Sequence, residues 1–326
     1  MGVMNTKHLP GLALIAILAI LIVNNPYTTV YLNGLVEDSH PVDSSQDALY
    51  EQIARAAEKY DAPPQDAKID RVWKAMPGYN GVKVDIKASY KKMQGETFDA
   101  RKIVFKQIPP KVHLDDLPPS PIYRGHPEKP MVSFLINVAW GNEYLPQMLE
   151  TLKKHNVQAT FFLEGRWVKE NPDLAKMIAA DGHEVGNHSY SHPKMETLGE
   201  AKTREELLKT NEIIEATTGE KPVWFGPPSG GFRDHTVLIA NELDMKTVMW
   251  TVDTIDWEKP SPETIIDRVM TKVHPGAMIL MHPTDPTSKA LDSLIKQIKD
   301  RSLRIGTVTK LMDEEHIIKI DQQMDK

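Results

Sequence analysis

The sequence predicts an α/β protein in which a parallel sheet or an α/β barrel is covered by helices. From Met131 onward, apolar segments of strand length alternate with amphipathic segments of helix length, and this alternation favours parallel strands joined by helices. Several helical segments end on residues that commonly close helices, namely Asn156, Gly182 and Gly219. The 326 residues, 40% of them hydrophobic, suffice for one large domain and a smaller companion.

Composition excludes several functional classes. The net charge is −6 and the Lys and Arg residues form no dense stripe, so no nucleic-acid partner is expected. The chain has no cysteine, which excludes a disulfide framework, a thiol nucleophile and a cysteine-based zinc site.

Residues 1–37 are interpreted as a signal peptide or a membrane anchor. An unbroken apolar run over residues 11–23 follows Lys7 and His8, which is typical of an export signal. No small-x-small cleavage site follows, and if residues 27–35 also enter the lipid, the span approaches the roughly 20 residues of a transmembrane helix. An uncleaved anchor is the first interpretation, a cleaved signal the second and a buried core helix the third. Either of the first two places the rest of the chain outside the cytoplasm.

Residues 38–108 are expected to form a small α+β domain. Apolar residues recur at helical spacing over 47–60 and alternate with charged residues over 81–90. The expected elements are helices over residues 47–60 and 68–76, a strand over 81–90 and its partner over 102–108. Residues 109–130 are rich in proline and are expected to form a stiff linker without a helix and with little strand pairing.

Residues 131–315 carry the strand–helix alternation, and residues 316–326 are interpreted as a C-terminal tail. In folds of parallel strands, the carboxyl ends of the strands and the loops after them form the functional site. The expected elements are strands over 132–140 and 157–165, helices over 143–156, 170–182 and 203–219, and further segments of the series over 221–228, 236–244, 245–253, 262–273, 277–282, 290–301 and 304–309.

Two histidines four residues apart, His188 and His192, form the sharpest local signal. Placed on a helical turn, they point the same way and can share one metal ion, because neutral imidazole is a common zinc ligand. A solvated or capping pair is the alternative. The position of the motif after a strand–helix unit favours the metal.

Five short motifs follow one another in the second half of the chain. They are NVQATFFLEG (156–165), HSYSH (188–192), PVWFGPPSG (222–230), TVDTIDW (251–257) and LMH (280–282). Together they resemble the polysaccharide deacetylases, also called the NodB-homology domain of carbohydrate esterase family 4, and HSYSH matches that family's metal-binding H[ST]xxH. The resemblance extends from Met131 to about Met312. The whole layout, with its N-terminal segment, looks most like the deacetylase-like sporulation proteins of bacilli.

The resemblance implies a distorted (β/α) barrel that hydrolyses an N-acetyl group on a β-1,4-linked aminosugar. It also implies an Asp-His-His centre for Zn²⁺ or another divalent metal, in which His188 and His192 are two ligands. A second Asp is the base in that family, and His282 corresponds to the general acid. The further cleft residues that the resemblance carries over are Asp256, Trp257, Pro227 and Pro228.

The chain departs from the family's first motif, TFDDG. Aligning its glycine on Gly141 puts Ala139 in the place of the base and Trp140 in the place of the metal-binding Asp. Alanine has no proton acceptor, and an indole has only an N–H donor. Gly226 stands where the family has an Arg, so Asp256, interpreted as the partner of that Arg, is expected to lack one. Loss of a positioned base alone lowers a rate by about 10²–10⁴-fold.

Trp140 has two interpretations, an aromatic face for a sugar ring or a plug in an empty metal pocket. Asn137, Glu143 and Asp253 are the nearest polar side chains that could replace a lost ligand, although solvated or capping roles are the expected ones. Surface or capping roles are also expected for the histidines at element ends, His155, His183 and His274.

The sequence therefore predicts an extracytoplasmic deacetylase homologue, anchored in the membrane or secreted, that acts at the cell wall. It is expected to bind peptidoglycan or another glycan containing N-acetylglucosamine, with deacetylation weak or lost and a metal weakly held or absent. An active metal-dependent deacetylase with a remodelled site is the alternative. A structural envelope component that makes protein contacts through residues 38–108 is the third hypothesis.

Overall fold

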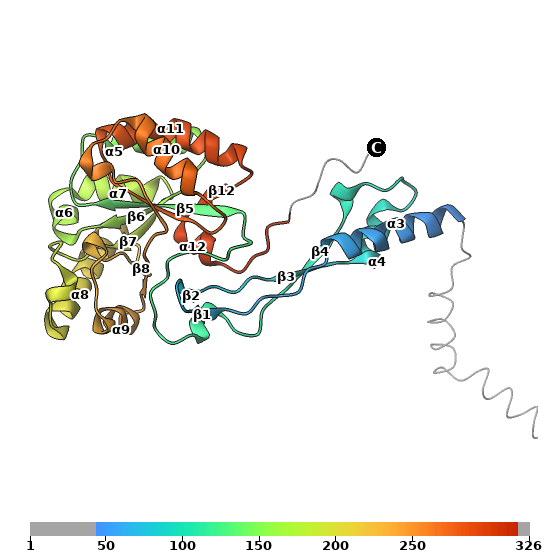
Figure 1. The fold of residues 1–326 in the computed structure, drawn as a ribbon, viewed down its shortest axis with the longest axis horizontal. Helices are drawn as coiled ribbons and strands as arrows, with labels where there is room; N and C mark the ends of the chain where they lie inside the picture. Colours follow the sequence, from blue (N-terminus) through green and yellow to red (C-terminus); the bar gives the residue numbers. More distant parts are fainter. Residues whose placement is uncertain (1–43, 319–326) are drawn as a thin grey trace, which may run out of the picture. The chain divides into compact units, whose positions relative to one another are not determined.

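The computed structural model describes residues 44–318, which form two compact units (Figure 1). The first unit contains residues 44–58 and 86–103, and the second contains residues 59–85 and 104–318. The predicted signal or anchor over residues 1–37 lies outside the described residues. Among residues 44–318, no helix combines the length and apolarity needed to cross a membrane.

The first unit is helical. Helix α3 (Ser44–Tyr60), predicted from residue 47 onward, buries Ile53, and helix α4 (Ile86–Met93) buries Met93. A short 3₁₀ helix, η2 (Ala100–Lys102), follows. Helix α4 replaces the second half of the strand predicted over 81–90. Its buried residues, Ser89 and Met93, lie four residues apart on one face of the helix, a spacing that the alternation of Ile86, Ala88 and Tyr90 did not reveal.

The second unit contains two antiparallel strand pairs outside the main sheet. Strand β3 (Gly81–Val84) pairs with β4 (Phe105–Ile108), as predicted, and β1 (Lys68–Asp70) pairs with β2 (Lys74–Met76). The helix predicted over residues 68–76 is wrong. The carboxylate of Asp70 accepts the N–H groups of Val72 and Trp73, at 2.7 and 2.8 Å, and such a local turn competes with helix formation. The predicted small domain over residues 38–108 is thus divided between the two units.

The proline-rich segment over residues 109–130 is packed against the main sheet. It contains a 3₁₀ helix, η3 (Leu114–Asp116), and Ile122 forms a parallel bridge with Val248. The N–H of Ile122 donates to the carbonyl of Thr247 at 2.9 Å. Strand pairing in residues 109–130 is limited to isolated bridges of Ile122, as expected, and the Ile122 side chain is buried in an apolar cluster with Leu135 of the main sheet.

The main sheet has eight strands, and every pairing in it is parallel, as the alternation predicted. The order is β10-β11-β5-β6-β7-β8-β9, and β12 also pairs with β5. No pairing among the described residues joins β9 to β10, so the sheet is an open half-barrel rather than a closed one. The strands are β5 (Met131–Val138), β6 (Thr160–Leu163), β7 (Glu184–Asn187), β8 (Trp224–Phe225), β9 (Lys246–Thr247), β10 (Val252–Asp253), β11 (Met278–Met281) and β12 (Arg304–Gly306).

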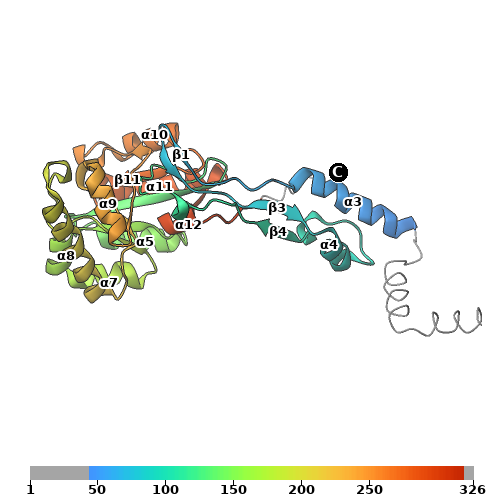
Figure 2. The same ribbon diagram turned by 90° about the horizontal axis from the view of Figure 1, so that it is seen from below.

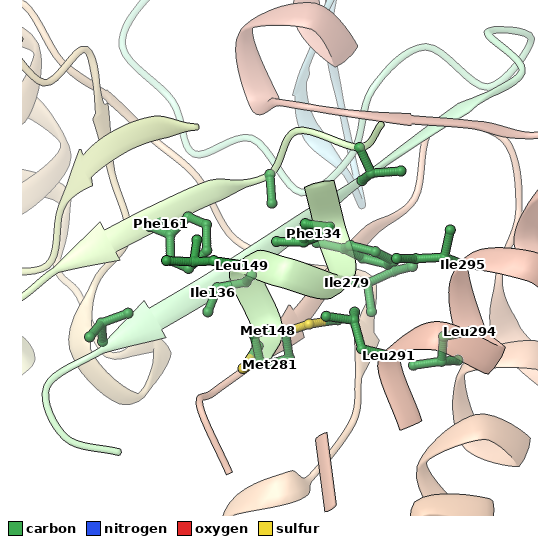
Figure 3. Close-up of a cluster of buried hydrophobic side chains, with 14 of the residues drawn as sticks. Phe134, Ile136, Met148, Leu149, Phe161, Ile279, Met281, Leu291, Leu294 and Ile295 are labelled. Atoms are coloured by element: carbon green, nitrogen blue, oxygen red, sulfur yellow. The ribbon is translucent and has the colours of Figure 1, made fainter. Parts of the chain in front are cut away.

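Helices pack on the sheet in both views of the chain (Figures 1 and 2). Strand β5 is buried along its whole length, so its two faces carry separate apolar clusters. Figure 3 shows the larger cluster, in which Phe134 and Ile136 of β5 lie among side chains of α5 and α11. The helices are α5 (Leu145–Lys154), α6 (Gly165–Glu170), α7 (Pro172–Ala180), α8 (Glu200–Thr218), α9 (Asp234–Glu242), α10 (Pro262–Lys272), α11 (Asp285–Asp300) and α12 (Val308–Met312).

Two histidines of the second unit are buried and uncharged. His183, expected at the surface, is 3% exposed because it closes the turn into β7, where its Nδ1 accepts the N–H of Ala159 at 3.2 Å. The Nδ1 of His126 accepts the N–H of Glu128 at the same distance. Burial lowers the pKa of both imidazoles to about 4. Protonation of Nδ1 in either ring would also place its N–H against the backbone N–H that Nδ1 accepts.

These two histidines make stability depend on pH. Unfolded histidine protonates near pH 6.5, whereas both folded imidazoles stay neutral down to about pH 4. The unfolded chain therefore binds more protons in this window, and the free energy of unfolding falls as the pH falls through it. We expect a loss of about 1 kcal/mol per histidine between pH 7.5 and 5.5, measured by urea denaturation. In the double variant His126→Gln/His183→Gln the loss should be about 2 kcal/mol smaller; an unchanged loss would contradict the assignment.

Candidate functional site

A cleft of about 440 Å³ lies at the carboxyl ends of the parallel strands. Six strand ends supply its walls, because the carboxyl ends of β5, β7, β8, β9, β10 and β11 and the residues after them all lie at this edge of the sheet. The lining residues are Asn137, Ala139, Trp140, His188, His192, Ser229, Trp250, Asp253, Trp257, Leu280 and His282.

The structure brings most of the predicted site residues into this cleft. Gly226, Pro227, Pro228 and Asp256 do not line it, although Gly226 and Asp256 bind two lining histidines from behind. Glu143, considered as a replacement ligand, lines a neighbouring hollow instead. Ser229 and Trp250 also line the cleft and were not predicted from the sequence. Ser229 lies within the motif over 222–230 and Trp250 directly before the motif over 251–257, which is the signal that could have found them.

His188 is held as a neutral imidazole with a fixed tautomer. Its Nδ1 donates to the carbonyl oxygen of Gly226 at 2.6 Å, so Nε2 carries the lone pair. Complete burial, together with the neighbouring His192, lowers the pKa of His188 to about 3. Burial lowers the pKa of His192 as well. The centroids of the two rings lie 5.0 Å apart and their planes meet at 69°. The pair therefore brings two imidazole rings together in the cleft.

The histidine pair lies on a loop rather than on the predicted helical turn. Ser189 and His192 both have positive φ, +60° and +53°, a conformation that no helix continues. The buried carboxylate of Glu206 on α8 fixes this loop by accepting the N–H groups of Tyr190 and Ser191, at 3.0 and 2.8 Å. Glu206 is a positioning residue that the sequence did not reveal, because it lies 14 residues beyond the motif.

His282 and Asp256 form an intact pair. The carboxylate of Asp256, fully buried, accepts from the ring Nδ1 of His282 at 2.8 Å, from its backbone N–H at 2.6 Å and from the hydroxyl of Thr287 at 2.6 Å. Asp256 thus has no Arg among these partners, as expected, but His282 and Thr287 supply the donors that a carboxylate with no water contact needs. The Nε2 of His282 is left for a ligand in the cleft.

Trp140 lies open in the cleft rather than filling a closed metal pocket. Its indole stacks on the ring of His282 at 5.9 Å, with only 6° between the planes, and 44% of the residue is exposed. The turn after it depends on Gly141, whose φ is +84° and where an added Cβ would lie 2.0 Å from the carbonyl oxygen of Pro283. The structure therefore favours the aromatic surface over the plug.

The donor set does not fit a three-ligand metal centre. Among the described residues, no group of three or more His, Cys, Asp or Glu side chains is placed to hold a metal ion. Trp140 offers no acceptor where the resemblance requires a carboxylate. The nearest carboxylate on the cleft wall, Asp253, accepts the N–H of Ile255 at 2.8 Å.

A parallel α/β half-barrel with a histidine cleft at its strand ends is the fold and site of a polysaccharide deacetylase domain. The chain belongs to the polysaccharide deacetylase family: the family model described as "Polysaccharide deacetylase" matches residues 124–248, and a solved structure described as a CE4 family pseudoenzyme is matched over 96% of its own length at 56% identity. A relative that matches nearly the whole chain is the uncharacterized protein YlxY of Bacillus subtilis, 57% identical over 90% of this chain and 93% of its own length.

Solved structures give a similar result. A structure from Bacillus anthracis, BA3943, described as a CE4 family pseudoenzyme, is 56% identical, covers 82% of this chain and 96% of its own, and has a TM-score of 0.80. A BA3943 mutant described as having restored enzymatic activity matches equally well. A peptidoglycan-N-acetylglucosamine deacetylase of Bacillus cereus is 37% identical over 52% of this chain and 63% of its own length.

Proposed function

We propose that this protein binds cell-wall glycan containing N-acetylglucosamine, outside the cytoplasm, and that its capacity for ordinary deacetylation is weak or lost. The apolar run over residues 11–23 supplies the export signal or anchor in this proposal. The names of the Bacillus and Listeria relatives, which are peptidoglycan deacetylases, support the class of glycan. The description of BA3943 as a pseudoenzyme supports the loss of catalysis.

One observation carries the proposal: Trp140 occupies the first-motif position and presents an exposed indole stacked on His282. Trp250 and Trp257 line the same cleft. Indole faces are large apolar surfaces with little conformational freedom to lose, and the C–H face of a pyranose packs on them. The histidine nitrogens and Asp253 supply polar groups around that surface, which is the composition of a ligand pocket.

The missing groups account for the weak catalysis. His282, oriented by Asp256, can still hold and donate a proton at Nε2. Ala139 stands where the family has its base, and its side chain cannot accept a proton. Loss of a positioned base lowers a rate by about 10²–10⁴-fold. Binding and proton donation therefore remain, while water activation is lost.

The proposal is tested by isothermal titration of the purified full chain with the N-acetylglucosamine tetramer. We expect wild type to bind and Trp140→Ala to bind about tenfold more weakly, since a stacked aromatic contributes about 1 kcal/mol or more. Trp140→Phe should keep most of the affinity. The control is Met177→Ala, an exposed apolar residue outside the cleft.

Two results would contradict the proposal. Wild type without measurable affinity for the tetramer would remove the binding function. Rapid acetate release by wild type, unaffected by Trp140→Ala, would instead favour the alternative of an active deacetylase with a remodelled site.

A further inference from the structure

The hairpin of β1 and β2 ends in a turn that carries exposed apolar side chains. Residues 71–73 form the turn, and Val72 at its centre is 61% exposed, the largest exposed fraction of any large apolar side chain in the described part of the chain. Ile69 on β1 is 46% exposed. Tight turns are usually built from Gly, Pro and small polar residues, so two exposed β-branched side chains at this place require a separate explanation.

The charge of this hairpin is opposite to that of the whole chain. Residues 68–76 contain three cations, Lys68, Arg71 and Lys74, and one carboxylate, Asp70, whereas the chain has a net charge of −6. The three cationic side chains are exposed. The carboxylate of Asp70 accepts two backbone N–H groups of the turn itself, at 2.7 and 2.8 Å. The hairpin therefore presents positive charge to the solvent.

The base of the hairpin is fixed to the second unit. Ala75 of β2 is buried in the same apolar cluster as Ile122, and its N–H donates to the carbonyl oxygen of Pro121 at 3.1 Å. The guanidinium of Arg124 lies over the ring of Trp73, 5.7 Å from the ring centroid, a cation–π contact. The exposed turn is therefore carried on a fixed base rather than on a free loop.

The combination of apolar and cationic side chains favours one class of partner. A soluble anionic polymer would neutralise Lys68, Arg71 and Lys74 but would leave Ile69 and Val72 in water. The surface of an anionic bilayer accommodates both kinds of side chain, because apolar groups enter the boundary between headgroups and acyl chains while Lys and Arg bind the headgroup phosphates.

We propose that the β1–β2 hairpin docks on the surface of a bilayer that contains anionic phospholipid, with Ile69 and Val72 at the level of the headgroups. This inference does not rest on glycan binding, since no residue of the hairpin lines the cleft. The contact is weak by itself, because two aliphatic side chains bury little area. An anchor over residues 1–37, the first interpretation of that segment, would raise the effective concentration of the hairpin at the bilayer.

The chain has no cysteine, so one introduced thiol can report on the turn. In the full chain, Val72→Cys is labelled with a dye whose emission depends on polarity. The labelled chain is reconstituted into vesicles of equal parts phosphatidylglycerol and phosphatidylcholine, or of phosphatidylcholine alone. We expect blue-shifted emission only with phosphatidylglycerol, and its reversal at high salt, because salt screens exposed charges. The control Leu208→Cys, at an exposed apolar position of α8, should not respond.

A set of charge variants tests the cations in the same labelled chain. Each basic residue near an anionic surface contributes a factor of about five, so Lys68→Gln/Arg71→Gln/Lys74→Gln should lower the ratio of docked to undocked turn by about 10²-fold. The matched control removes the same charge elsewhere on the second unit and should leave the ratio unchanged. It changes three exposed lysines of α5, α7 and α10, as Lys153→Gln/Lys176→Gln/Lys272→Gln.

Several outcomes would overturn membrane docking. They are the absence of an emission shift with phosphatidylglycerol vesicles, an equal shift with phosphatidylcholine alone, and an equal loss in the two triple variants. An equal shift with soluble polyphosphate in the absence of lipid would identify a polyanion as the partner and would contradict the proposal as well. None of these outcomes changes the expected binding of N-acetylglucosamine oligomers, so the two proposals are tested separately.

Discussion

Replacing Ala139 and Trp140 by aspartates is expected to turn this protein into a metal-dependent deacetylase. Trp140→Asp adds a carboxylate beside the two imidazoles of His188 and His192, and Ala139→Asp adds the missing base. Because the His282–Asp256 pair is already in place, the double variant would possess base, acid and ligands together. We expect acetate release from chito-oligosaccharides at least about 10²-fold above wild type in the presence of zinc, since a base alone contributes 10²–10⁴-fold.

The single variant and the metal content separate the two effects. Trp140→Asp alone should bind zinc after dialysis against a mild chelator but release little acetate, because the base is still missing. Wild type should retain substoichiometric zinc in the same dialysis. Circular dichroism must first establish that each variant is folded, because removing the indole leaves a void.

The sequence comparison suggests Gly226→Arg as a third substitution, but the structure leaves little room for it. A Cβ at this position would lie 2.9 Å from the ring of Phe162, which is fully buried. We therefore expect the double variant to carry the gain and the triple variant to lose stability. A folded double variant with neither zinc nor activity would show that the cleft is no longer a vacated deacetylase site. Wild type as active as the double variant would favour the remodelled enzyme.

Removing the buried ammonium group of Lys129 is expected to destabilise the second unit by about 2–3 kcal/mol. Only 2% of Lys129 is exposed, and its Nζ donates to the carbonyl oxygens of Lys310 and Asp313, at 2.7 and 2.6 Å. It also donates to the carboxylate of Asp313 at 2.6 Å. These acceptors lie at the carboxyl end of α12, so Lys129→Met leaves helix carbonyls and a partly buried charge without their donor.

The matched control for Lys129→Met is Lys310→Met. Lys310 also forms an ion pair with Asp313, at 3.7 Å, but its side chain is 64% exposed. Exposed pairs contribute about 0–1 kcal/mol, so Lys310→Met should cost less than about 1 kcal/mol in the same urea titration. Equal losses in the two variants would mean that burial gives Lys129 no special role.

The order of strands and helices after residue 131 could be predicted because each element has its own hydrophobic period. Strand β5 is buried throughout and apolar except at Ser133 and Asn137, as expected for a strand buried on both faces. The predicted helix over residues 68–76 is wrong because a single polar side chain favours a turn over a helix there. Residues 68–76 form a hairpin because Asp70 binds the N–H groups that follow it, and no periodicity in the segment reveals that turn.

The sequence by itself determined which chemical groups the cleft lacks and which it keeps. The resemblance to the deacetylase motifs located Ala139, Trp140, His188, His192 and His282, which all lie in loops that follow strands, and the carboxyl ends of parallel strands share one edge. The departures at residues 139, 140 and 226 follow from the same resemblance and needed no coordinates.

Only the tertiary structure decided how those groups are used. Asp256 binds His282, 26 residues away, and not an absent Arg; Trp140 stacks on that histidine instead of filling a pocket. The carbonyl of Gly226 selects the tautomer of His188 across 38 residues. Each of these contacts joins the ends of different strands, whose spacing depends on how helices and sheet pack together. The spacing between strand ends cannot be predicted from the local sequence, because burial and hydrogen-bond partners depend on the whole folded structure.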